Sequence, residues 1–110
     1  MADDPDTTRR EFHEAVNMTP SELESWLGTD ESKAVGQKNG GGESVGHGSG
    51  RRIVRLLRTT KDDLGDDDLA HMRTVVGYVH RHMAQRPSGD VRDTAWRYSL
   101  MNWGHDPLKR

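Results

Sequence analysis

Apolar residues recur at helical spacing along most of this chain, and no stretch alternates between apolar and polar residues as a strand would. The longest pattern predicts a helix over about residues 66–85, which Pro87 ends. Shorter patterns predict helices over about 51–60, 90–103 and 7–16. The chain is therefore predicted to be all-α.

Capping signals mark two further helices in the first third of the chain. Thr19 is a suitable N-cap, Pro20 suits the first helical position, Glu22 completes a capping box, and Gly28 ends the helix. The segment from Thr29 to Gly36 repeats this arrangement in one or two turns. Together with the later helices, these segments predict a compact bundle of four to five helices.

Length and composition predict one small domain. The chain has 110 residues, of which 31% are hydrophobic and 31% charged, so six large aromatic residues must supply much of the core. We expect a disordered N-terminus over residues 1–5, a helical domain over 6–107 that contains a Gly-rich loop at 36–50, and a C-terminal tail over 108–110. The absence of cysteine, signal peptide and long apolar run favours a cytoplasmic protein that does not enter a membrane.

The Gly-rich segment has two interpretations. Seven of the fifteen residues from Gly36 to Gly50 are glycine. Such a composition is typical of a mobile tether. Backbone amides at a helix start also bind anions, so Gly46–Gly50 could form a cradle for a phosphate with Arg51 and Arg52 beside it.

Arginines line one edge of the helix predicted over 51–60. At 100° per residue, Arg51, Arg55 and Arg58 fall within about 60° of one another, opposite the apolar side chains. These arginines could follow a phosphate backbone. They could also pair with the aspartates of residues 62–68, which would cancel their field.

Charge is segmented along the chain although the net charge is only −2. Residues 1–36 carry −6, residues 37–61 carry +5, residues 62–69 carry −5, and residues 70–110 carry +4. A positive surface can therefore form locally. The three aspartates that open the helix at residue 66 would repel phosphates, so this helix is not expected to read bases.

The remaining patterns predict neither a metal site nor a catalytic site. His80 and His82 point to opposite sides of their helix, and His71 lies about 16 Å from His82, so no local histidine pair can chelate a metal. His71, Tyr78 and His82 line one flank of the helix, either as a border of the core or as a surface that becomes cationic below about pH 6.5. No catalytic constellation is present, and we expect neither an enzyme nor a cofactor.

Four blocks resemble a domain-of-unknown-function family of small bacterial proteins. They read "MTPSELESWL", "ESVGHGSGRRIV", "DDDLAHMRTVVGYVHRHMAQRP" and "WRYSLMNWGHDP", and the similarity runs from about Glu11 to Pro107. The resemblance implies no catalytic residues or mechanism. Some relatives are labelled as DNA-binding proteins, which agrees with the arginine edge.

These observations favour a small, nucleoid-associated type of DNA-binding protein with low sequence specificity. The alternatives are a protein-interaction module whose Gly-rich loop orders on a partner, and a sensor of small anions. The predicted nucleic-acid or anion site comprises Gly46, His47, Gly48, Ser49, Gly50, Arg51, Arg52, Arg55 and Arg58. Its possible extension comprises Arg73, Arg81, His82, Arg92 and Arg97.

Overall fold

The computed structural model describes residues 4–35 and 45–109, except for the side chains of 45–47. These residues form six α-helices and one short 3-10 helix, with no strand, so the predicted all-α fold is confirmed. The elements are α1 (Pro5–Ala15), α2 (Pro20–Leu27), α3 (Asp30–Val35), α4 (Val45–Leu57), η1 (Lys61–Asp63), α5 (Asp66–Met83) and α6 (Ala95–Asn102).

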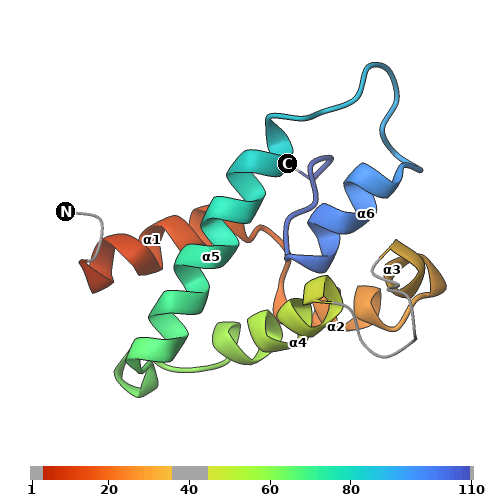
Figure 1. Cartoon of the computed structure of the whole chain (residues 1–110). Coiled ribbons are helices and arrows are strands. Elements are labelled where there is room, and N and C mark those ends of the chain that lie inside the picture. Colours follow the sequence, from red (N-terminus) through yellow and green to blue (C-terminus); the bar gives the residue numbers. More distant parts are fainter. Residues whose placement is uncertain (1–3, 36–44, 110) are drawn as a thin grey trace.

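The helices pack in pairs that are distant in the sequence. Figure 1 shows α1 crossing α5, while α2 runs beside α4 and α6 lies between α5 and α3. One continuous core joins them, and its largest fully buried side chains come from five helices. These side chains are Phe12, Leu23, Ile53, Met72, Val75 and Leu100.

The predicted caps of α2 and α3 are confirmed. Thr19 Oγ1 accepts a hydrogen bond from the Glu22 N–H at 3.1 Å, and Glu22 Oε1 accepts one from the Thr19 N–H at 2.8 Å. This reciprocal pair satisfies two amides that the helix start leaves without partners. Thr29 caps α3 in the same way, because its hydroxyl accepts from the Ser32 N–H at 3.2 Å.

Three helix starts differ from the prediction. Helix α1 begins at Pro5, the last residue of the segment 1–5 that was predicted to be disordered. Helix α4 begins at Val45, six residues before Arg51, so residues 45–50 are helical and the prediction of a loop up to Gly50 is wrong for them. The earlier part of the predicted loop, 36–44, lies outside the described residues. Helix α6 begins at Ala95 rather than near Asp90, since Thr94 caps it by accepting from the Arg97 N–H.

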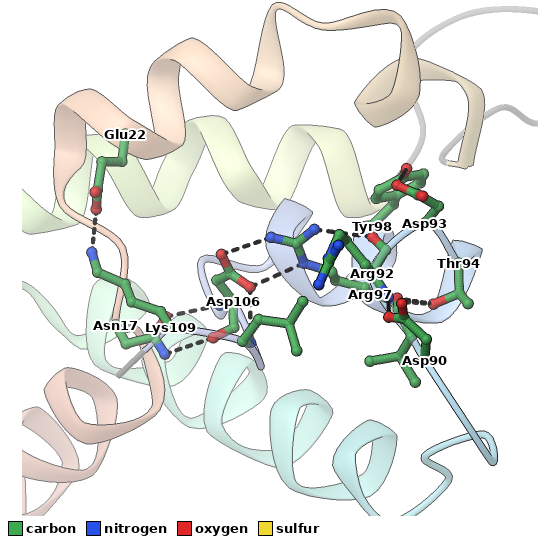
Figure 2. Close-up of polar contacts among 12 residues, drawn as sticks. Asn17, Glu22, Asp90, Arg92, Asp93, Thr94, Arg97, Tyr98, Asp106 and Lys109 are labelled. Atoms are coloured by element: carbon green, nitrogen blue, oxygen red, sulfur yellow. Dashed lines mark hydrogen bonds and ion pairs between the residues drawn. The ribbon is translucent and has the colours of Figure 1, made fainter.

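The segment after α6 folds back onto the link between α1 and α2. Gly104 adopts a φ of 83°, which ends the helix, and a Cβ there would lie 2.9 Å from Val16 Cγ1. Asn17 and Asp106 then exchange hydrogen bonds: the Asn17 amide donates to the Asp106 carbonyl at 2.9 Å and accepts from the Asp106 N–H at 2.8 Å (Figure 2). These contacts fix the C-terminal segment against the bundle.

Candidate nucleic-acid interface

Three exposed arginines form a line along α4 and the residue that follows it. Arg51, Arg55 and Arg58 are all exposed, whereas Ile53 and Leu56 on the opposite side are buried. The division of faces follows from the helical spacing in the sequence. We call Arg51, Arg55 and Arg58 the basic edge.

Carboxylates reach this helix from two directions. Arg58 donates to Glu24 of α2, with 3.2 Å between Nη2 and Oε1 and 3.5 Å between Nη1 and Oε2. Arg52, which lies beside the basic edge, has Nη2 at 3.5 Å from Asp68 Oδ1 and donates to the Asp67 carbonyl at 3.2 Å. Glu24 and Asp68 therefore reduce the positive charge of this part of the surface.

The run of aspartates masks the basic edge less than its sequence position suggests. Asp68 is the only carboxylate of residues 62–68 that forms an ion pair with α4 among the described residues. Asp68 also caps its own helix, because its Oδ2 accepts a hydrogen bond from the Gly65 N–H at 3.0 Å at the start of α5. This backbone hydrogen bond is the largest cause that lowers the pKa of Asp68, and the bond from Arg52 lowers it further.

Glu24 is a neighbour of the basic edge that the sequence did not indicate. It lies 34 residues before its partner Arg58, and only the packing of α2 along α4 brings them together. The sequence around a charged residue on a helix surface does not indicate which residue of another helix will pair with it. Arg51 lies in the same groove, which Leu27, Gly28 and Val54 line between α2 and α4.

The last residues of the Gly-rich segment serve packing. Ser49 and Gly50 are buried inside α4, and Ser49 Oγ lies 2.9 Å from His71 Nε2. A Cβ on Gly50 would lie 2.5 Å from the Asn102 carbonyl oxygen and 2.7 Å from Leu27 Cδ2. These two residues therefore do not form the predicted anion cradle, whereas Gly46, His47 and Gly48 lie in the first turn of the helix.

The predicted extension divides into two groups. Arg73, Arg81 and Arg92 are exposed and make no ion pair with any residue that the structure describes. Arg97 is different, since its Nε and Nη2 each donate to Asp106 at 3.1 Å and its Nη1 donates to the Arg92 carbonyl at 2.9 Å (Figure 2). Arg97 holds the C-terminal segment, so it is removed from the predicted interface.

His82 is also removed, because it belongs to a stack of rings between α5 and α6. Its ring lies 5.2 Å from Tyr78 and 6.0 Å from Trp96, and Tyr78 in turn stacks on Trp103 at 4.2 Å. Burial lowers the pKa of His82 and of His71, so both rings resist protonation. The structure thus favours a border of the core over a surface that becomes cationic in mild acid.

Comparison with known proteins places the chain in a family. A family model described as "Protein of unknown function (DUF3140)" matches residues 11–101, most of the chain. No curated protein and no solved structure matches the chain. No helix within the described residues has the length and apolar character needed to cross a membrane.

Proposed function

Because the chain belongs to the DUF3140 family, whose function is unknown, we propose a function from its own residues: it binds DNA through phosphates, with low sequence specificity. The observation that supports this proposal is the basic edge, in which three exposed arginines, one of them paired with Glu24, follow one line of α4 and its C-terminal end. No histidine, metal or cofactor is needed for this role. The nucleoid-associated character inferred from the sequence remains part of the proposal.

Arginine suits this role because its planar fork donates two parallel hydrogen bonds to a phosphate. Each phosphate that an arginine neutralises releases counterions from the duplex, which drives binding at low salt. Arg55 is central to the edge and makes no ion pair with a described residue. Exposed Arg73, Arg81 and Arg92 add positive charge elsewhere on the surface.

The existing ion pairs do not prevent phosphate binding. Arg58 and Glu24 both keep about half of their side-chain surface exposed, at 49% and 62%. Exposed pairs of this kind contribute below about 1 kcal/mol, so a phosphate can replace the carboxylate. Glu24 therefore tunes the affinity of the basic edge rather than blocking it.

Low sequence specificity follows from the residues that begin α5. Asp66, Asp67 and Asp68 open α5, and their negative charge opposes the entry of this helix into a groove. Contacts with phosphates position a protein on a duplex without reading its sequence. An architectural role is the form of DNA binding that these residues support.

The test is a titration of duplex DNA at several salt concentrations. The wild-type affinity should fall steeply with salt, and the Arg51→Ala/Arg55→Ala/Arg58→Ala variant should show a slope shallower by up to about three units for three lost contacts. Glu24→Gln should bind more tightly than wild type at low salt, because it removes the carboxylate that competes for Arg58.

Arg10→Ala is the matched control, since Arg10 is exposed on α1, away from α4. The salt slope of Arg10→Ala should stay close to that of the wild type. The single variant Arg55→Ala should have a clearly shallower slope. No binding by the wild type at about 50 mM salt would contradict the proposal and favour the protein-interaction alternative. Binding of inorganic phosphate alone, with amide shifts confined to residues 46–52, would favour the anion sensor.

A further inference from the structure

A cleft opens on the side of the bundle where α2 meets the C-terminal segment. Its volume is 540 Å³, within the range of binding sites for small groups. Its lining includes Ser21, Ser25 and Trp26 of α2, and Met101, Asp106 and Lys109 of α6 and the C-terminal segment. None of these residues belongs to the basic edge.

The floor of the cleft is apolar and its aromatic ring is held in place. Met18, Trp26 and Met101 supply the apolar surface. The Trp26 indole N–H donates to Asn102 Oδ1 at 2.7 Å, and the ring packs against Tyr98 with 5.4 Å between centroids. A fixed indole with methionine side chains in the same lining suits a long aliphatic stem that ends in a cation.

Carboxylates stand at the rim of the cleft. Hydrogen bonds from Lys109 and from the Thr19 N–H lower the pKa of Glu22. Burial acts to raise the pKa of Asp106, but hydrogen bonds from Arg97 and the Leu108 N–H outweigh it, so this pKa is also lowered. Both groups are therefore charged at neutral pH.

Two more carboxylates lie near the outer edge of the aromatic pair. The Tyr98 hydroxyl donates to Asp93 Oδ1 at 3.3 Å. Burial raises the pKa of Tyr98 most, and the charges of Asp93 and Glu31 raise it further. Glu31 and Asp93 make no ion pair among the described residues, but neither lines the cleft, where Glu22 pairs with Lys109 and Asp106 pairs with Arg97.

The chain already places one lysine in this cleft. Lys109 lines the wall, and its ammonium group donates a hydrogen bond to Glu22 Oε1 (Figure 2). The pair is exposed, with 31% of the lysine side chain and 50% of the glutamate accessible to solvent. A contact of this kind is weak and can be exchanged.

We infer that this cleft binds a lysine or arginine side chain from a basic segment of a partner protein, in competition with Lys109. The aliphatic stem lies along Trp26 and Met101, and the cationic head group lies at Glu22, in place of the Lys109 ammonium group. This site is separate from the proposed DNA interface, and neither depends on the other.

The experiment is a titration of the ¹⁵N-labelled protein with a peptide of alternating lysine and glycine, followed by NMR. We expect the peptide to shift the Trp26 indole N–H and the amides of Ser25 and Lys109. The same peptide with acetylated lysines should produce no shift, because acetylation removes the charge. Shifts confined to residues 62–68, or equal shifts with the acetylated peptide, would overturn the inference.

Three variants locate the site. Glu22→Gln keeps the acceptor that caps α2 but removes its charge, so it should weaken peptide binding while the protein stays folded. Ser25→Arg should weaken binding by at least about tenfold, since it places a like charge in the cleft. Lys109→Ala should strengthen binding, because the internal competitor is lost.

Thr74→Arg is the control for added charge, because Thr74 is exposed on α5. It should bind the peptide as wild type does. If Thr74→Arg weakens binding as much as Ser25→Arg, or if Lys109→Ala changes nothing, the inference is wrong. The Arg51→Ala/Arg55→Ala/Arg58→Ala variant should bind the peptide as wild type does, which separates this site from the basic edge.

Discussion

Asn102 joins three helices through one buried side chain. Its Oδ1 accepts from the Trp26 indole N–H at 2.7 Å and from Ser32 Oγ at 2.5 Å, and its Nδ2 donates to the Ser32 carbonyl at 3.1 Å. Only 2% of the residue is exposed, and Ser32 is fully buried. Buried polar groups are costly without partners, so this network specifies how α2, α3 and α6 fit together.

The Asn102→Ala variant should therefore be strongly destabilised. It leaves the buried Trp26 N–H and Ser32 groups without partners, and we expect the free energy of unfolding to fall by about 1–3 kcal/mol. Urea denaturation followed by tryptophan fluorescence measures this change. Gln85→Ala is the control, because this amide side chain is exposed. Its free energy of unfolding should differ from that of the wild type by less than about 0.5 kcal/mol.

Two glycines inside helices have opposite surroundings. Gly50 of α4 touches the backbone of Asn102 and the side chain of Leu27, so α4 approaches α2 and α6 closely at this point. A Cβ on Gly77 of α5 would meet only the guanidinium of Arg81, at 3.0 Å, which is the end of a flexible side chain. The same substitution should thus have opposite effects in the two helices.

We expect Gly50→Ala to lower the free energy of unfolding by about 1–3 kcal/mol, because the backbone of α6 would have to shift. Gly77→Ala should raise it by up to about 1 kcal/mol, since alanine favours the helix and Arg81 can move aside. Thermal denaturation by circular dichroism compares the two. Equal stabilisation by both substitutions would mean that α4 and α6 are not in close contact.

Stability of the whole molecule should depend on pH in two separate ranges. The pKa values of His71 and His82 are lowered from 6.5, with burial as the largest cause for both; Arg52 also lowers that of His71, and Asp68 opposes the shift. Lowered histidine pKa values mean that the unfolded chain binds protons first as the pH falls below 6.5. Lowered pKa values of Glu22, Asp68 and Asp106 act in the same direction at lower pH.

The free energy of unfolding should therefore be greatest between about pH 7 and 9, fall between about pH 6.5 and 5, and fall again below about pH 4.5. The His71→Gln/His82→Gln variant should have a flatter profile between pH 7 and 5. His80→Gln, at an exposed position, is the control. Urea denaturation at a series of pH values gives the free energy of unfolding of the wild type and both variants. If the double variant loses stability between pH 7 and 5 as steeply as the wild type does, His71 and His82 are not the cause.

The sequence alone determined the elements that depend on neighbouring residues. The Thr19 capping box, the start of α5 at its three aspartates and the line of arginines on α4 were all predicted, because caps and helical faces depend on contacts within about four residues. The all-α fold followed from the same periodicity. The family resemblance was confirmed as a family of unknown function.

Only the tertiary structure decided what these elements contact. The pairing of Arg58 with Glu24, the capture of Arg97 by Asp106 and the burial of Gly50 each join residues that the bundle brings together. Glycine composition predicted a loop at residues 45–50, whereas close packing of three helices explains why small residues are needed there. Helical spacing shows which residues share a face, but the partner of that face comes from the packing of distant segments.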